Sequence, residues 1–252
     1  MLDLSRDRTR NVIVTGGSRG LGFGIAQKLI AAGYKVIAVA RKMSDQLATA
    51  MREAKEPHGD ALQFMPFDLA EIDEIPKLVS TIRKNFGPIY GLVNNAAIGT
   101  DGTLAMMYNS QIEKLVRVNT VSPIVLTKYS VRSMISEGGG RVVNVSSIIG
   151  FTGFSGLSVY GATKASMIGF TRSLAREVGR MGVNVNAVAP GFIETDMTSS
   201  LSDDERQKVA NRSALRRLAE VEDVANAVEF LLGDKAKNIT GTVLTVDAGS
   251  TA

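Results

Sequence analysis

Short apolar runs rich in Val and Ile alternate along the chain with longer stretches in which apolar residues recur every three or four positions. The short runs predict buried strands, and the longer stretches predict amphipathic helices between them. The expected strands cover residues 12–15, 35–40, 61–65, 89–93, 141–145, 184–189 and 242–246. The expected helices cover residues 21–32, 44–55, 71–86, 110–118 running into 121–136, 159–181 and 221–231. Regular alternation of strand and helix predicts an α/β fold with a parallel sheet and helices on both faces.

The whole chain, residues 1–252, is expected to form a single domain. Hydrophobic residues make up 44% of it, which is enough for a large core, and no Pro- or Ser-rich linker or repeat divides it. No apolar stretch approaches the roughly 20 residues of a membrane span. The first ten residues are too polar for a secretory signal. We therefore expect a cytoplasmic protein.

Composition excludes several kinds of chemistry. The chain has no cysteine, so thiol catalysis, disulfides and Cys-ligated metals are excluded. Its one histidine, His58, lies in a turn-like segment, so a His-rich zinc site is impossible and a Ser-His-Asp hydrolase is poorly supported. No metal site is expected. The net charge of +4 is small for this length, and no basic run is interleaved with aromatics, so nucleic acid is not an expected partner.

A glycine-rich turn follows the first expected strand and precedes the first expected helix. This context suits a dinucleotide, because glycines let the backbone approach a pyrophosphate and the helix N-terminus offers N–H groups to it. Three residues separate the first two glycines, whereas the commoner dinucleotide pattern has one. A turn between strand and helix can also be only a turn. The candidate phosphate-binding residues are Gly16, Ser18, Arg19, Gly20, Leu21 and Gly22.

Tyr160 and Lys164 stand four residues apart with small residues between them. On a helix this spacing places both side chains on one face, one turn apart. An ammonium group beside a phenol favours the phenolate, so we expect Lys164 to lower the pKa of Tyr160 from its usual value of about 10. Such a phenol can give a proton to a carbonyl oxygen or take one from an alcohol. The same spacing also occurs where two residues share a helix face without a chemical role.

Polar residues follow two further expected strands. Ser147 comes just after the strand at 141–145, and Asn94 comes just after the strand at 89–93. Ligands bind beyond the carboxyl ends of strands in open α/β sheets, although Ser147 is also a common residue in turns and caps. Asn119 lies between two expected helices, where the residue type by itself favours a helix cap.

In their order and spacing, these motifs resemble those of the short-chain dehydrogenase/reductases, over about residues 10–249. The matching segments are residues 15–22, Asn94-Asn-Ala96, Asn119, Ser147, Tyr160-x-x-x-Lys164 and Pro190-Gly191. Residues 190–198 and 239–249 are similar to those of the 3-oxoacyl-[acyl-carrier-protein] reductase branch. Ala97 departs from the family, which usually has Gly there. The resemblance implies a single Rossmann-type, doubly wound sheet of about seven strands in the order 3-2-1-4-5-6-7.

The resemblance also implies four catalytic residues. Tyr160 would donate the proton to a carbonyl oxygen, while Lys164 would lower the pKa of Tyr160 and hold the nicotinamide ribose. Ser147 would hydrogen-bond the substrate oxygen and orient it. Asn119 would interrupt a helix and hold a water that links Lys164 to solvent.

The expected cofactor is NADPH. NAD enzymes usually carry an Asp or Glu after the second strand, where this chain has Arg41 and Lys42. Arg41 and Arg19 suit a 2′-phosphate, because a guanidinium group binds phosphate oxygens in a fork; the alternative is two solvated surface arginines. The other cofactor-binding residues implied by the resemblance are Asp68, Leu69, Asn94, Ala96, Tyr160, Lys164, Pro190, Gly191, Ile193 and Thr195.

The expected reaction is the reduction of a ketone, most closely that of 3-oxoacyl-[acyl-carrier-protein] in fatty acid synthesis. The alternatives are another ketone, a keto ester or a polyketide intermediate. A carrier protein would need a basic surface, and Glu137-Gly-Gly-Gly140 weakens that interpretation. A nucleotide-sensing regulator is a different class, but a sensor has no need of Ser147, Tyr160 and Lys164 together.

Two expectations concern larger features of the molecule. Residues 192–217 break the alternation of strand and helix and are either a surface excursion or a lid over the substrate, and their position favours a lid. The helices at 121–136 and 159–181 carry more apolar residues than one sheet face can cover, which predicts a homotetramer. The apolar residues expected to face another subunit are Val131, Met134, Met167, Phe170 and Leu174.

Overall fold

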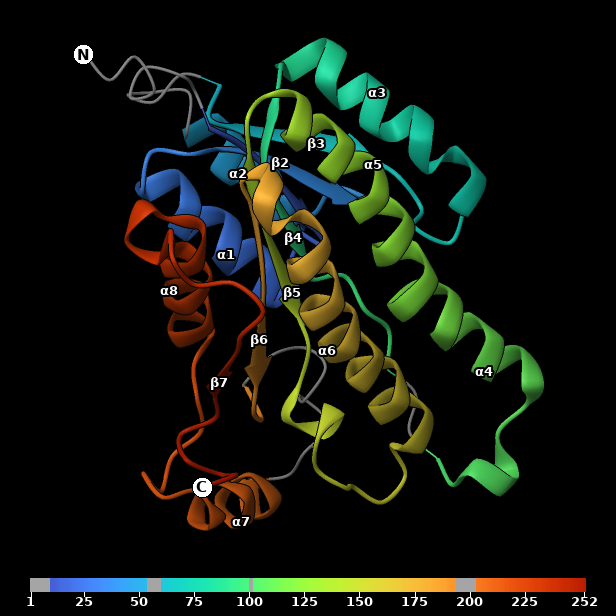
Figure 1. Cartoon of the computed structure of the whole chain (residues 1–252). Helices are drawn as coiled ribbons and strands as arrows, with labels where there is room; N and C mark the ends of the chain where they lie inside the picture. The colour runs from blue at the N-terminus through green and yellow to red at the C-terminus, as the bar shows by residue number, and fades with distance from the viewer. Residues whose placement is uncertain (1–9, 54–59, 100–101, 194–202) are drawn as a thin grey trace.

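The computed structural model describes residues 10–53, 60–99, 102–193 and 203–252 (Figure 1). Seven strands form one parallel sheet in the order β3-β2-β1-β4-β5-β6-β7. This order confirms the doubly wound fold expected from the resemblance. The strands are β1 (Asn11–Thr15), β2 (Lys35–Ala40), β3 (Leu62–Pro66), β4 (Ile89–Asn94), β5 (Gly140–Val145), β6 (Val183–Pro190) and β7 (Val243–Val246).

Helices connect the strands and lie within a few residues of their expected positions. The α-helices are α1 (Gly20–Ala31), α2 (Asp45–Glu53), α3 (Ile75–Phe86), α4 (Asn109–Val116), α5 (Ser122–Ser136), α6 (Ser158–Val178), α7 (Asp203–Arg212) and α8 (Val221–Leu232). Short 3-10 turns are η2 (Ile72–Glu74), η3 (Leu104–Met106), η5 (Ile148–Gly150), η6 (Gly179–Met181) and η7 (Asp234–Ala236). A π-helical segment, η4 (Arg117–Val121), joins α4 to α5.

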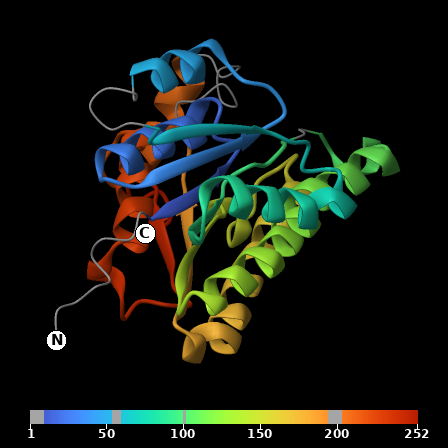
Figure 2. The ribbon, with the colours of Figure 1, turned by 90° about the horizontal axis from the view of Figure 1, so that it is seen from above.

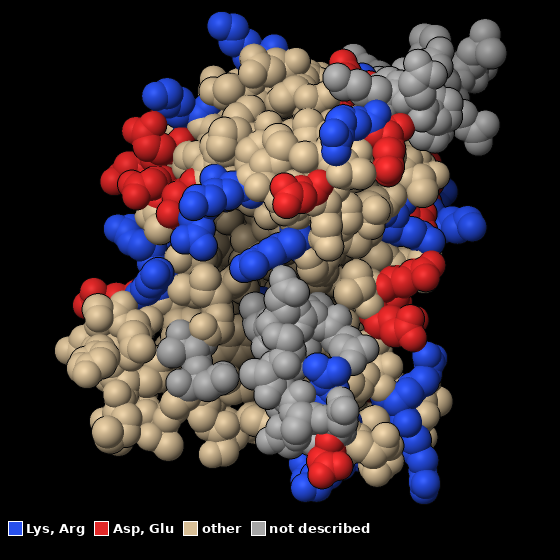
Figure 3. Space-filling model, turned by 180° about the vertical axis from the view of Figure 1, so that it is seen from behind, with Lys and Arg blue, Asp and Glu red and all other residues tan. Residues whose placement is uncertain are grey.

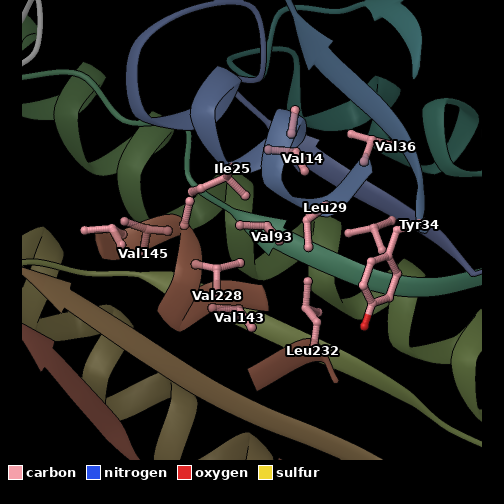
Figure 4. Packing of buried hydrophobic residues seen from close by; sticks show 14 of the residues in the cluster. Val14, Ile25, Leu29, Tyr34, Val36, Val93, Val143, Val145, Val228 and Leu232 are labelled. Atoms are coloured by element: carbon pink, nitrogen blue, oxygen red, sulfur yellow. The ribbon is translucent and has the colours of Figure 1, made fainter. Parts of the chain in front are cut away.

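The sheet separates two hydrophobic cores. On one face, Ile25 and Leu29 of α1 and Val228 of α8 pack against β-branched residues of the central strands (Figure 4). On the other face, α3, α5 and α6 cover the sheet, as the view from above shows (Figure 2). Because both faces are covered, the strands are apolar throughout, and all five residues of β1 are buried.

The second core corrects one sequence-based expectation. Val131 and Met134 of α5 and Met167 of α6 were expected to face another subunit, but they are 6%, 0% and 3% exposed. Val131 and Met134 belong to the core under the sheet, because these helices turn their most apolar sides toward β5 and β6. Phe170 and Leu174 of α6 are partly exposed, so these two remain candidates for a contact between subunits.

Connections at the carboxyl ends of β1, β4, β5 and β6 meet at one edge of the sheet. The parallel registers place Thr15 beside Val39 and Asn94 beside Asn144 at that edge. Ligands of open α/β sheets bind there. Within the described residues, no helix has both the length and the apolar character needed to cross a membrane.

Candidate active site

The glycine turn between β1 and α1 is held by the end of β4. Gly16 has φ +67°, which glycine adopts without strain. A side chain at Gly22 would not fit, since its Cβ would lie 2.3 Å from the Gly16 carbonyl oxygen. Asn95 Nδ2 donates to the Thr15 carbonyl oxygen at 2.9 Å, and Thr15 Oγ1 accepts from the N–H groups of Asn95 and Ala96, both at 3.0 Å. The turn therefore presents backbone at the N-terminus of α1.

Two exposed arginines lie at this turn. Arg19 is the N-cap of α1, and Arg41 directly follows β2. The Ser44 hydroxyl donates to the Ser18 carbonyl oxygen, which brings the segment after β2 against the glycine turn. Residues 36–44 contain no Asp or Glu. This corner thus brings two exposed arginines to the N-terminus of α1, a setting suited to phosphate.

Tyr160 and Lys164 share one face of α6, as their spacing predicts. Lys164 Nζ lies 5.6 Å from the centre of the Tyr160 ring and donates a 2.9 Å hydrogen bond to the Val145 carbonyl oxygen. Lys164 is 4% exposed, whereas Tyr160 is only partly buried. The lysine is thus fixed to the end of β5, beside a tyrosine that keeps part of its surface exposed.

The expectation that Lys164 lowers the pKa of Tyr160 is wrong in this structure. Burial raises the pKa of the Tyr160 hydroxyl to about 12, and burial also lowers the pKa of the Lys164 ammonium to about 8. The reason is that removal from water disfavours the charged form of each group. The Tyr160 hydroxyl therefore keeps its proton at neutral pH, as a proton donor to a carbonyl oxygen must.

Ser147 lies between β5 and α6. It is the N-cap of η5, and its Oγ accepts a hydrogen bond from the Ile149 N–H at 3.2 Å. The neighbouring Ser146, which the sequence interpretation missed, donates from its buried Oγ to the Lys164 carbonyl oxygen at 2.8 Å. The end of β5 is therefore bonded to both the main chain and the side chain of Lys164, which positions Ser147 relative to α6.

Asn119 is not a helix cap. It lies in the π-helical segment η4, which follows from Pro123, because proline has no N–H to donate to the Asn119 carbonyl oxygen four residues earlier. Its buried side chain accepts from the Ile98 N–H at 2.9 Å and donates to the Ile98 carbonyl oxygen at 2.8 Å and Thr163 Oγ1 at 3.3 Å. Asn119 thus ties the loop after β4 to α6, one residue before Lys164.

Asn94 turns its side chain into the protein. Its Nδ2 donates to Thr127 Oγ1 and to Asn144 Oδ1, both at 2.8 Å. Asn144 Nδ2 in turn donates to Thr171 Oγ1 at 2.8 Å, and the Thr171 hydroxyl donates to the Met167 carbonyl oxygen at 2.7 Å. This buried polar seam joins β4, α5, β5 and α6. A contact between Asn94 and a nucleotide would have to come from its backbone.

The remaining candidates line the same edge of the sheet. Asp68 is exposed after β3, and its Oδ1 accepts from the Ala70 N–H at 2.9 Å, while Leu69 packs against the second core. Gly191 follows Pro190 at the end of β6, where a Cβ would lie 2.7 Å from Asp247 Cβ.

The segment expected to form a lid begins at the end of β6. Ile193 is buried and forms a parallel bridge with Ala219. Thr195 and the rest of residues 194–202 lie outside the described residues, and α7 occupies much of the remainder. The role of this segment as a lid stays a prediction.

Comparison with known proteins identifies the family. The model of the short chain dehydrogenase family matches residues 10–206. The chain belongs to the short-chain dehydrogenase family. It is 41% identical over 237 residues to 3-oxoacyl-[acyl-carrier-protein] reductase FabG of Escherichia coli, an alignment that covers 94% of this chain and 95% of the relative. It is 37% identical to FabG of Staphylococcus aureus, over 96% of this chain and 98% of that protein.

Solved structures with the same fold carry nicotinamide cofactors. A gluconate 5-dehydrogenase of Burkholderia cenocepacia in complex with NADP and tartrate aligns with a TM-score of 0.90 and 27% identity, over 96% of this chain and 95% of that chain. ElxO with NADP bound aligns with a TM-score of 0.88 and 28% identity, over 96% and 99%. This short-chain dehydrogenase is an NAD(P)-dependent oxidoreductase. Among its described residues, no group of His, Asp and Glu is arranged to hold a metal ion.

Proposed function

We propose that this short-chain dehydrogenase uses NADPH to reduce the ketone of a 3-oxoacyl thioester to a secondary alcohol. The observation that carries the proposal is the grouping of Ser147, Tyr160 and Lys164 at the edge where the glycine turn lies. Lys164 bonds to the end of β5 through both its Nζ and its carbonyl oxygen. These contacts hold the proton donor and the orienting hydroxyl in a fixed relation, which is what acid catalysis of carbonyl reduction needs.

The residues at the glycine turn fit NADPH. A Cβ at Gly22 would lie 2.3 Å from the Gly16 carbonyl oxygen, and one at Gly16 would lie 3.0 Å from Asn95 Nδ2, so the tight turn before α1 requires glycine at both positions. Arg19 and Arg41 would hold the 2′-phosphate, and Asp68 would hold the adenine. The remaining backbone and side-chain contacts would come from Ala96, Gly191 and Ile193, with Lys164 on the nicotinamide ribose. NADPH supplies the hydride when it is bound.

The residues of the chain supply the proton and the orientation. Tyr160 holds a proton on its hydroxyl at neutral pH, since burial keeps its pKa near 12. The Tyr160 hydroxyl donates that proton to the carbonyl oxygen as the alkoxide develops. Ser147 Oγ, which accepts from the Ile149 N–H, has its own hydrogen available for the same oxygen. Lys164, held near the ring, stabilises the phenolate that remains, and Asn119 would link Lys164 to solvent through a water.

The acyl carrier is the part of the proposal drawn from the relatives. Several FabG proteins at 37–41% identity are 3-oxoacyl-[acyl-carrier-protein] reductases. In this chain, α5 is followed by Glu137 and three glycines. Arg141 lies at the start of β5 with its guanidinium 5.9 Å from the Tyr90 ring centre. Arg141 is thus at the opposite edge of the sheet from the candidate site. The exposed arginines of α6, Arg172 and Arg176, offer a basic surface for a carrier.

Steady-state assays with both nicotinamide cofactors test the proposal. Purified protein is mixed with NADPH or NADH and with acetoacetyl-acyl-carrier protein, acetoacetyl-coenzyme A or ethyl acetoacetate, and loss of reduced nicotinamide is recorded. We expect the highest kcat/KM with NADPH and a thioester. If the enzyme turns over ethyl acetoacetate but neither of the two thioesters, its substrate is another ketone. Cofactor binding without turnover of any ketone would favour a nucleotide-sensing regulator.

A further inference from the structure

Two loops beside the candidate site expose large apolar side chains. Leu104 and Met106 lie in η3, Tyr108 is the N-cap of α4, and Phe151 and Phe154 lie between η5 and α6. These five side chains are between 48% and 79% exposed. They account for five of the eleven exposed large hydrophobic side chains in the described part of the chain. We call these five residues the apolar rim. Exposed apolar side chains gathered in this way mark binding surfaces more often than scattered ones do.

Contacts between the loops make the rim one surface. The Gly102 N–H donates to the Gly156 carbonyl oxygen at 3.2 Å, which ties the η3 loop to the loop before α6. The Phe154 ring lies 5.7 Å from the Phe192 ring, centre to centre, at the start of the segment after β6. Three connections at the carboxyl edge of the sheet therefore meet around Phe154.

The rim is continuous with the catalytic residues. Phe151 and Phe154 lie on the loop that leads directly from Ser147 to Tyr160. The Leu157 N–H donates to the Phe154 carbonyl oxygen at 3.2 Å, and the Gly161 N–H donates to the Leu157 carbonyl oxygen at 2.7 Å. The aromatic rings thus extend from the backbone that forms the first turn of α6. A substrate whose oxygen is held by Ser147 and Tyr160 has this surface beside it.

The two described segments that carry the rim contain no charged residue. Residues 102–112 and 142–163 contain no Lys, Arg, Asp, Glu or His. In the space-filling view the lobe at the lower left is tan wherever its residues are described, whereas Lys and Arg side chains are frequent on the part above it (Figure 3). An anionic group placed on this lobe would lose water without gaining a partner.

We infer that the apolar rim binds an uncharged hydrocarbon chain of the substrate, so that kcat/KM rises with chain length. This inference rests on the proposed reduction of a ketone at Tyr160 and adds the substrate class. A fully buried methylene group contributes about fourfold in affinity, and one buried on a single side contributes about twofold. A dodecanoyl chain is then strongly preferred over a butanoyl chain.

The test compares two series of ketones. The first is the 3-oxobutanoyl, 3-oxooctanoyl and 3-oxododecanoyl thioesters of N-acetylcysteamine, and the second is methyl ketones of matching length. We expect kcat/KM to rise about twofold per methylene in wild type. Phe154→Ser and the double variant Leu104→Ser/Met106→Ser should flatten this slope while leaving the shortest substrate within about twofold of wild type. Met181→Ser is the matched control, since Met181 is 42% exposed in η6, just beyond the end of α6 that lies away from Tyr160.

Each outcome separates this inference from the proposed function. A slope in the methyl ketones without turnover of the thioesters would refute the proposed substrate and support the rim. Thioester turnover that is independent of chain length would support the proposed function and overturn the rim. Rim variants in which kcat/KM rises with chain length as steeply as in wild type would also overturn the inference. If those variants instead change the oligomeric mass and leave the slope unchanged, the rim is a contact between subunits.

Discussion

The Nζ atom of Lys164 donates a 2.9 Å hydrogen bond to the carbonyl oxygen of Val145, so the last residue of β5 holds the ammonium group. The centre of the Tyr160 ring lies 5.6 Å from the same Nζ atom. The strand thus fixes the lysine independently of the tyrosine. Substitutions at Tyr160 should then change the chemistry without displacing Lys164.

Tyr160→Phe should lower kcat by at least about a thousandfold and leave NADPH binding nearly intact, because it removes the proton donor and its orientation while keeping the ring. Cofactor affinity is measured by fluorescence titration and kcat by steady-state assay. Tyr129→Phe is the control, since it removes a tyrosine hydroxyl from α5, outside the candidate site and the apolar rim. A Tyr160→Phe enzyme that keeps more than about a tenth of the activity would mean that another group is the acid.

Because Lys164 is buried, the free energy of unfolding should increase as the pH rises above about 8. Burial lowers the pKa of Lys164 to about 8 from its ordinary 10.5, so in this window the unfolded chain binds more protons than the native protein. The free energy of unfolding therefore rises with pH, by on the order of 1–2 kcal/mol between about pH 7.5 and about pH 9.5. The raised pKa of Tyr160 acts with the opposite sign, but only above about pH 10.

Urea unfolding of wild type and Lys164→Met across this pH range isolates the contribution of Lys164. All other titrating groups are common to the two proteins, so the difference between their free energies of unfolding should grow with pH in favour of wild type. Parallel pH profiles would show that Lys164 keeps its ordinary pKa in the native protein.

Arg41→Asp should weaken NADPH binding by roughly 2–3 kcal/mol more than NADH binding, the scale of a charge-assisted hydrogen bond replaced by repulsion. Dissociation constants for both cofactors provide the measurement. Arg52→Asp makes the same charge change on an exposed arginine of α2 and serves as the control. Equal losses for NADPH and NADH would exclude Arg41 from the 2′-phosphate site.

Two glycines should respond in opposite ways to alanine. Gly22→Ala places a Cβ 2.3 Å from the Gly16 carbonyl oxygen, so it should lower the free energy of unfolding by about 1–3 kcal/mol and weaken the cofactor. Gly169→Ala changes an exposed position of α6 where no atom lies within 4 Å of the new Cβ, so it should raise the free energy of unfolding by about 0.5–1 kcal/mol. Urea unfolding distinguishes the two, and a neutral Gly22→Ala would show that the turn can relax.

Assembly as a homotetramer remains a prediction, with its surface revised. Val116 at the end of α4 and Val121 at the end of η4 are 40% and 39% exposed and replace the buried α5 and α6 residues as contact candidates. Two different two-fold contacts, one at these helices and one at β7, would generate four copies. Light scattering should give a mass near four times 26.8 kDa, and a fully active species of 26.8 kDa would refute it.

Local sequence patterns predicted the elements well, because strands such as β1 are buried on both faces and must be apolar throughout. For the same reason the sequence did not show which way the Asn94 side chain points, since a strand covered on both faces has no alternation of polar and apolar residues. Thr15 and Asn95 were missed as partners because 80 residues separate them in the chain. The pKa of Tyr160 was mispredicted because spacing shows a neighbouring charge but not burial. In sequence, Met106 looks the same as a core residue, although it is 79% exposed.

The buried seam of Asn94, Thr127, Asn144 and Thr171 has a consequence for how the molecule opens. Hydrogen bonds join Asn94 to Thr127 and to Asn144, and Asn144 to Thr171, so separating α5 or α6 from the sheet deprives a buried amide of a partner. Opening at either helix therefore carries a free-energy cost within the seam. These four elements should behave as one cooperative unit in amide hydrogen exchange, while the loops that carry the apolar rim are free to exchange on their own.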